Sequence, residues 1–236
     1  MANLNLKVLA VSLALLLSAA CGEMREPGPM RNESVSIEQK KSELVRVELK
    51  LKAGELTVEP GAQKLMEGEF VYNVPEWKPV VRFDETSFRG HLQVEQPAGA
   101  SASGDTQYDW NLRFNDKVPM DMVVNLGAGE ARLNLGGLHL RSLEINMGVG
   151  ELNLDLRGTP QRDYEVRVHG GVGEATIRLP RDVGVVADAR GGIGSIDVKN
   201  LERQGHQYVN EAYGNARNTI RLEVRGGIGE INLVAE

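Results

Sequence analysis

Residues 148–156 of this 236-residue chain read GVGELNLDL, and the phrase recurs with small changes through the second half of the sequence. The other versions are GAGEARLNL from Gly127, GGVGEATIRL from Gly170, GGIGSIDV from Gly191 and GGIGEINL from Gly226. The last glycines of successive copies are 21, 23, 21 and 35 residues apart. A fainter copy, AGELTV, holds Gly54. Recurrence at such a period predicts a repeat architecture.

Each copy changes the phase of its apolar residues at the glycines. The odd-numbered residues of 143–149 are apolar, whereas after the glycines the even-numbered residues of 152–156 are apolar. A shift of one residue would turn a strand's apolar side chains into water, so we expect the chain to bend there. A bulge with a glycine in the left-handed region would supply the shift, with the apolar residue between the glycines filling the inside of the bend. The predicted corner residues are Gly54, Gly127, Gly129, Gly148, Gly150, Gly171, Gly173, Gly192, Gly194, Gly227 and Gly229.

The rest of the chain also has the two-residue period of β-strands. From Leu44 the sequence VRVELKLK alternates strictly between apolar and charged residues, and no stretch beyond the N-terminal segment shows helical periodicity. We therefore expect an all-β fold, an elongated β-repeat stack in which units of about 21 residues stack like the coils of a β-solenoid. A two-sheet sandwich of bent hairpins is the alternative. The β-repeat domain is predicted at 43–236, irregular to about 118 and regular over 119–236.

The first residues determine the expected location. Residues 8–17 read VLAVSLALLL, too short to span a bilayer as a helix, and small residues lead to Cys21, the only cysteine. This start resembles a bacterial lipoprotein signal, which implies a signal peptide at 1–20, lipidation of Cys21 and a flexible tether at 21–42. An unmodified Cys21 after ordinary cleavage is the alternative. We expect a lipid-anchored protein of the bacterial cell envelope, in the outer membrane if the cell is Gram-negative, because Gly22 carries no retention signal.

Composition and motifs narrow the function classes. The net charge of −6 disfavours nucleic-acid binding and electrostatic docking on anionic lipids, so membrane contact is expected through acyl chains alone. The glycine pairs lack the third glycine and following helix of a dinucleotide site, and the calcium nonapeptide's ligand position is apolar here. The four histidines are scattered, and no G-x-S-x-G occurs. We predict no catalytic residues, no metal and no cofactor, and keep a carbohydrate-active enzyme as a minor alternative.

Two groups of residues are candidates for contact. If the copies stack in register, the glutamates after the corners form a column, which we expect arginines to balance; a row of divalent cations is the alternative. These residues are Glu55, Glu130, Glu151, Glu174 and Glu230, with Arg132, Arg178 and Arg225 as the arginines. The candidate partner contacts are Trp77, Trp110, Tyr208 and Tyr213, since aromatic side chains between strands bind sugars or proteins. They could instead plug the ends of the stack.

One segment supports a family resemblance. YVNEAYG at 208–214, followed by TIRLEVRGGIGEINL at 219–233, resembles the closing segment of the toast-rack family of bacterial envelope proteins. The resemblance covers 44–236 and implies stacked β-strands with no assigned activity. More distantly the repeats resemble adhesin-like surface proteins and LiaF-type regulators of the response to cell-wall-active antibiotics. We expect a non-catalytic binding or adhesin-like scaffold with a protein or glycan partner. The alternative is an envelope-stress regulator that acts through a protein partner.

Overall fold

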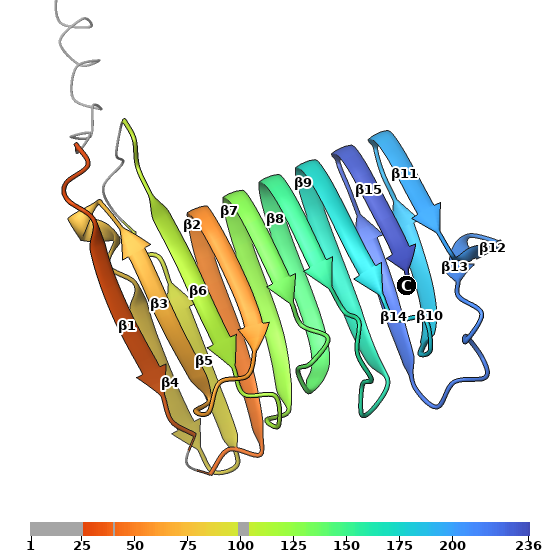
Figure 1. Ribbon diagram of the computed structural model, residues 1–236, viewed down its shortest axis with the longest axis horizontal. Helices are drawn as coiled ribbons and strands as arrows, with labels where there is room; N and C mark the ends of the chain where they lie inside the picture. Colours follow the sequence, from red (N-terminus) through yellow and green to blue (C-terminus); the bar gives the residue numbers. More distant parts are fainter. Residues whose placement is uncertain (1–25, 40, 99–103) are drawn as a thin grey trace, which may run out of the picture.

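A computed structural model describes residues 26–39, 41–98 and 104–236, and this part of the chain is all-β (Figure 1). Its only helical element is one short turn, η1 (Pro75–Trp77). The predicted signal peptide and Cys21 lie outside the described residues. Among the described residues, no element is a helix with the length and apolarity needed to cross a bilayer.

Fifteen strands form one continuous hydrogen-bonded system. In chain order they are β1 (Arg31–Ile37), β2 (Leu44–Pro60), β3 (Met66–Tyr72), β4 (Val80–Thr86), β5 (Arg89–Glu95), β6 (Tyr108–Phe114), β7 (Met120–Asn134), β8 (Leu140–Asp155), β9 (Tyr164–Leu179), β10 (Gly184–Arg190), β11 (Ile193–Lys199), β12 (Glu202–Gln204), β13 (Gln207–Val209), β14 (Thr219–Arg225) and β15 (Ile228–Ala235).

The long strands β2, β7, β8 and β9 each run up one layer, bend at their glycines and run down the other layer. They are parallel and in register, so that Gly54, Gly129, Gly150 and Gly173 follow one another across the stack. Two further coils are split at the bend, into β10 with β11 and β14 with β15. The bends line one long edge of the molecule, the upper edge of Figure 1. The fold is thus an elongated β-repeat stack, as predicted, and its two layers enclose the core in the manner of a sandwich.

The coils are not stacked in the order of the sequence. The last one, β14 with β15, pairs with β9 on one side and with β10 and β11 on the other. The fifth glycine copy therefore lies between the third and the fourth. All of these pairings are parallel, so each apolar residue stacks on its counterpart about 4.8 Å away.

The N-terminal end closes the stack with antiparallel strands. β5 pairs with the first arm of β2 and β6 with its second arm, and together they replace one coil. Beyond these two strands the pairing is antiparallel: β4 pairs with the outer edge of β5, β3 with the outer edge of β6, and β1 with β3. Because β1 pairs with β3 along its whole length, the prediction of a tether as far as residue 42 is wrong from Arg31 onward. The alternation of Val35 and Ile37 with serines was its signal.

The core at this end is aromatic, which corrects one predicted contact residue. Trp110 lies in β6, not in a loop, and is fully buried. Its ring meets those of Phe70 and Tyr108 edge to face, at centroid distances of 5.6 and 5.7 Å. Such pairs add to the free energy gained by burying the rings. Trp110 stabilises the N-terminal end and is not available to a partner.

Candidate functional site

The bends differ in what fills them. The inward-facing residue just before the corner is Leu51 in β2, Leu126 in β7 and Met147 in β8, and these three are buried. The equivalent residue is Gly170 in β9, Gly226 after β14 and Gly191 after β10. We call the first three filled bends and the last three hollow bends.

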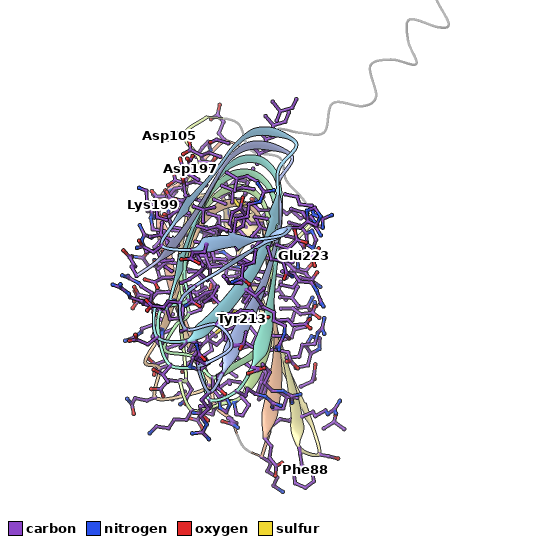
Figure 2. The ribbon with its side chains drawn as sticks, turned by 90° about the vertical axis from the view of Figure 1, so that its right-hand side faces the viewer. Phe88, Asp105, Asp197, Lys199, Tyr213 and Glu223 are labelled. Carbon is purple, nitrogen blue, oxygen red and sulfur yellow. The ribbon has the colours of Figure 1, made fainter. Side chains whose placement is uncertain are left out.

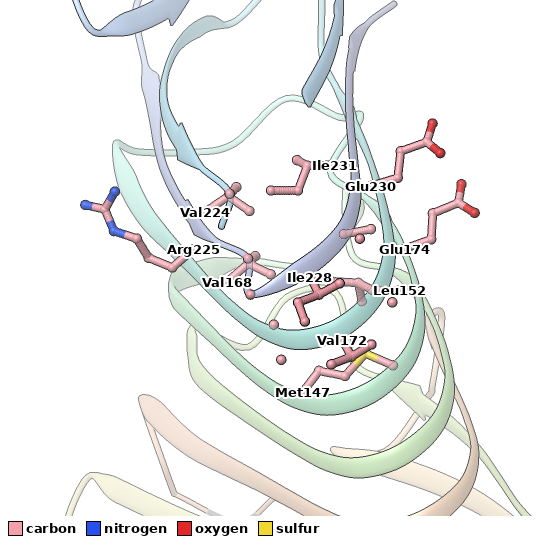
Figure 3. Close-up of a pocket in the computed structure, with 18 of the residues that line it drawn as sticks. Met147, Leu152, Val168, Val172, Glu174, Val224, Arg225, Ile228, Glu230 and Ile231 are labelled. Carbon is pink, nitrogen blue, oxygen red and sulfur yellow. The ribbon is translucent and has the colours of Figure 1, made fainter. Parts of the chain in front are cut away.

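The hollow bends enclose an apolar cavity of about 40 Å³ (Figure 3), which we call the hollow. That is room for a few atoms the size of a water molecule. Met147 bounds it on the side of the filled bends, and Gly191 and Ile193 line it in the last coil. Its other walls are mostly glycine backbone and inward-facing aliphatic side chains: Leu152, Val168, Ala175, Val224 and Ile231. Glu174, Arg225 and Glu230 also border it.

Five of the six bends contain two corner glycines separated by one residue, and the bend of β2 contains only the second, Gly54. Backbone geometry explains why both positions are glycine. The second glycine has φ between +130° and +143° in each bend, including Gly54 of β2, a conformation that strains any other residue. At Gly150, for example, a Cβ atom would also overlap the carbonyl oxygen of Gly129 in the neighbouring strand. The first glycine has an ordinary φ, but a Cβ there would overlap the adjacent strand, as at Gly148 against Gly127.

Two details of the predicted corner are wrong. No extra residue appears in the ladder at the bends, because every strand bends at the same level and the register continues through. There is therefore no bulge between neighbours. The residue between the two glycines also does not fill the bend. Val149, Val172, Ile228 and Ile193 are 54, 47, 52 and 71% exposed.

These residues form an apolar row along the edge of the molecule, which we call the apolar ladder. The pairing order runs Ala53, Ala128, Val149, Val172, Ile228, Ile193. Their side chains enlarge steadily from the filled bends toward the last hollow bend. Val172, Ile228 and Ile193 also border the hollow.

The glutamates stack beside this ladder, as the sequence suggested, but arginine balances only one end. Arg132 pairs with Glu130 on its own strand and with Glu55 on the next, the latter at 3.1 Å. The hydrogen bond to Glu55 contributes most to raising the pKa of Arg132. Arg178 and Arg225 pair elsewhere, with Glu236 and with Asp188 and Glu223. Among the described residues Glu151, Glu174 and Glu230 make no ion pair, so the column is uncompensated beside the hollow.

The last coil is partly covered by the β12–β13 hairpin, which crosses this end below the bends (Figure 2). β13 pairs with β10 at Ala187 and Val186, and Tyr208 packs against the core. Asn210 holds the following loop in place: its amide donates to the Val183 carbonyl at 2.7 Å and its Oδ1 accepts from the Val185 amide at 2.9 Å. Sequence reasoning missed Asn210, although it lies within the YVNEAYG segment.

The aromatic candidates are thus not brought together. Tyr208 is half-buried in the cap, and Tyr213 is 40% exposed on the loop after it. Trp77 is at the opposite end of the stack, in η1, partly buried with its ring 5.6 Å from that of Tyr108. The described residues contain no cluster of three or more His, Cys, Asp or Glu side chains that could hold a metal ion.

The hollow was not predicted, although the sequence contains its signal. The filled bends read LKAG, LGAG and MGVG, while the hollow bends read GGVG, GGIG and GGIG. At two of the three hollow bends the additional glycine is not required, because a Cβ would meet nothing closer than 4.0 Å at Gly170 and 3.8 Å at Gly191; at Gly226 it would approach Ile231 Cδ1 at 3.0 Å. A glycine that neither conformation nor contact demands marks an empty space.

Comparison with known proteins identifies relatives of the whole stack. Residues 26–178 match the family model of the N-terminal domain of toast_rack, and residues 128–233 match the C-terminal model of LiaF, of the cell wall-active antibiotics response. A crystal structure from Clostridium sporogenes, provisionally described as a cell adhesion protein, is 30% identical with a TM-score of 0.83. The alignment covers 88% of this chain and all of that one.

More distant structures share little with this chain. Two proteins provisionally described as adhesins, from Bacteroides fragilis and Parabacteroides merdae, are 9 and 12% identical, with TM-scores of 0.35 and 0.29. Each alignment covers 89% of this chain and 99% of the other. At these scores they carry no argument. No curated protein matches the chain.

Proposed function

This chain belongs to the toast-rack family, and we propose that it is a non-catalytic binding scaffold of the bacterial cell envelope, anchored through a lipid on Cys21. It holds a protein partner at the C-terminal end of the stack, where the hollow bends and the apolar ladder lie. The description of the Clostridium sporogenes relative as a cell adhesion protein supports a binding role.

The observation that carries this proposal is the exposure of the apolar ladder. Seven large apolar side chains of the described residues are exposed, and four of them belong to the ladder: Val149, Val172, Ile228 and Ile193. The other three, Met30, Phe88 and Tyr213, are scattered. Contiguous exposed apolar residues mark interaction sites, whereas single ones are ordinary.

The chemistry of the same end favours binding over catalysis. The hollow is walled mainly by glycine backbone and aliphatic side chains, which bury apolar groups but transfer no protons. The carboxylates of Glu174 and Glu230, which also border it, point away from its interior (Figure 3). The nearby carboxylate of Asp188 has a lowered pKa, chiefly because Arg190 donates a hydrogen bond to it, with Arg225 also close. A carboxylate held ionised in this way is a poor general acid.

A crosslinking experiment in intact cells tests the proposal. The wild-type chain and a Val172→Ser/Ile228→Ser variant are crosslinked, purified and compared for captured protein. We expect the variant to lose the partner that the wild type captures, while Phe88→Ser, which removes an exposed apolar residue at a distant turn, keeps it. A partner captured equally by all three chains would overturn the proposal. Release of a Cys21→Ala variant from the membrane fraction tests the anchor separately.

A second candidate function is supported by one comparison. The LiaF C-terminal match covers the hollow bends, which favours a regulator of the envelope-stress response acting through its partner. This function predicts that deletion of the gene changes transcription during treatment with a cell-wall-active antibiotic. It also predicts that the ladder variant has the same transcriptional effect as the deletion. An unchanged transcriptional response to the antibiotic in the deletion strain would exclude it.

A further inference from the structure

We infer that the hollow receives one aliphatic side chain of an extended strand from a partner protein, which pairs with the free edge of β11 and carries a basic residue opposite Asp197. This inference rests on the proposed function and specifies how the partner is recognised. Three independent features of the last coil lead to it: an open strand edge, an unfilled interior and uncompensated carboxylates.

The open edge belongs to β11. Among the described strands β11 pairs only with β15, whereas β10, the other arm of the same coil, pairs with β14 and is covered by β13. One edge of β11 therefore presents unpaired backbone N–H and C=O groups to solvent next to Ile193, which is 71% exposed. Such an edge is a template for an added strand.

The register of the stack determines which residue of the added strand would face the hollow. Leu51, Leu126 and Met147 occupy this level in the filled bends, and Gly191 occupies it in the last coil. A strand that continued the stack beyond β11 would place one side chain against Gly191. A Cβ at Gly191 itself would meet only Ile196 and Ile231 atoms, at 3.8 and 3.9 Å, which are ordinary contact distances. An aliphatic side chain fits the apolar walls there.

The carboxylates near the free edge of β11 favour a positive charge on the added strand. Asp197 is exposed at the edge and, among the described residues, makes no ion pair, like Glu230 on the neighbouring strand. At the level of Asp197, β7 has Arg132, which pairs with Glu130 on its own strand and with Glu55 on β2. A basic residue on the added strand opposite Asp197 would form the same kind of cross-strand pair.

A second copy of this chain is a poorer occupant. The free edges of its longer described strands are those of β11, β1 and β4. β11 has Gly191 at the level of the hollow, and β1 and β4 both stop short of that level, so none of them would fill it. Pairing of two β11 edges would also bring two acidic columns to the same interface. The occupant is therefore a strand of another protein with an aliphatic residue where β11 has glycine.

The chain contains a strand with the required features, which makes a defined probe. β7 has Leu126 at the level of the hollow and Arg132 at the level of Asp197. A fluorescently labelled peptide of residues 125–134, which leaves out the part of β7 that would meet β13, is titrated with the full chain and its anisotropy is measured. We expect saturable binding, about tenfold or more weaker for the Leu126→Gly peptide and several-fold weaker for Arg132→Glu.

Variants of the protein provide matched controls. Gly191→Leu, which fills the hollow from within, should remove the difference between the β7 peptide and its Leu126→Gly form. Asp197→Lys should weaken the β7 peptide and strengthen the Arg132→Glu peptide, while Phe88→Ser should change nothing. Circular dichroism confirms that each variant is folded.

Several outcomes would overturn the inference. Absence of binding would do so, as would equal affinities of the peptides with and without Leu126, or unchanged discrimination by Gly191→Leu. Sedimentation that shows a dimer abolished by Gly191→Leu would assign the site to a second copy. If the peptide fails while the ladder variant still loses its partner in cells, the inference falls and the proposed function stands; if the ladder variant keeps its partner, the proposed function itself falls.

Discussion

The filled and hollow bends share one backbone and differ in one side chain. Gly129 and Gly173 have φ values of +130° and +143°, and both approach the preceding strand too closely for a Cβ. The residue directly before the first corner glycine differs: it is Leu126 in one bend and Gly170 in the other. The comparison separates glycines required by folding from glycines that leave room, and only the second kind bears on binding.

The two regions also distribute apolar surface differently. Where Leu51 and Leu126 fill the bend, the ladder residues outside are Ala53 and Ala128. Where the bend is hollow, the ladder ends in isoleucine, at Ile228 and Ile193. From β2 toward β11, therefore, the apolar side chain inside the bend is lost and the apolar side chain on its outer surface becomes larger. The hollow bends leave the interior incompletely packed, which destabilises the protein, and they expose apolar side chains, which is typical of an interaction site.

The largest expected loss of stability comes from replacing a corner glycine, and it tests whether the filled and the hollow bends need the same backbone conformation. Gly129→Ala and Gly173→Ala should each lower the free energy of unfolding by about 3 to 5 kcal/mol, because φ is strained and the Cβ overlaps a carbonyl oxygen. Urea denaturation measures the loss. If either variant unfolds at the wild-type midpoint, the two bends do not share one backbone requirement.

Emptying a filled bend should cost somewhat less. Leu126→Ala should lower the free energy of unfolding by about 3 kcal/mol, and Met147→Ala, which borders existing empty space and is 9% exposed, by about 2 kcal/mol. The same urea assay compares them. A larger loss for Met147 than for Leu126 would mean that packing is tighter at the hollow than the cavity implies.

Filling a hollow bend should have a smaller effect of opposite sign. Gly170→Ala should raise the free energy of unfolding by about 0.5 to 1 kcal/mol, since its φ is ordinary and its Cβ has space. Gly171→Ala, one residue later, is the matched control and should destabilise, because its Cβ would overlap the Gly148 carbonyl oxygen. Thermal unfolding reports both, and destabilisation by Gly170→Ala would show that the hollow is not empty.

The smallest effect concerns the acidic column. Arg132→Ala should lower stability by about 0.5 kcal/mol in low salt, by losing an exposed ion-pair network. Thr176→Arg places an arginine at the same level on β9, next to Glu174, and should raise stability by a similar amount. Both differences should shrink in 1 M salt. A salt-independent effect would assign Arg132 a packing role instead.

Much of this arrangement follows from local patterns. The two-residue alternation and the recurring glycine pairs predicted the strands, the bends and the in-register glutamates, because a parallel stack repeats whatever its unit contains. Trp110 was misassigned although YDWNLRF alternates as a buried strand should, with Tyr108, Leu112 and Phe114 on the same face. The strand signal for Trp110 is therefore present in the sequence.

Other features have no local signal. The copies at Gly191 and Gly226 have nearly the same sequence, GGIGSI and GGIGEI, so neither indicates which one adjoins β9. Their order is set by the long connection from Asn200 to Asn218 and by Asn210, which anchors it. The exposure of Val149 and its counterparts depends on how sharply the backbone turns, which alternation alone does not specify.

The non-sequential order of the last coils bears on how the molecule is completed during synthesis. β10 and β11 leave the ribosome before β14 and β15, yet their permanent neighbour is the coil made last. Until β14 and β15 emerge, β9 and the β10–β11 coil each have one strand edge without its neighbour, and exposed strand edges of this kind are prone to aggregation. A product that ends after β11 but before Thr219 would lack the strands that join β10–β11 to β9, whereas one that ends after β9 would be a shorter stack.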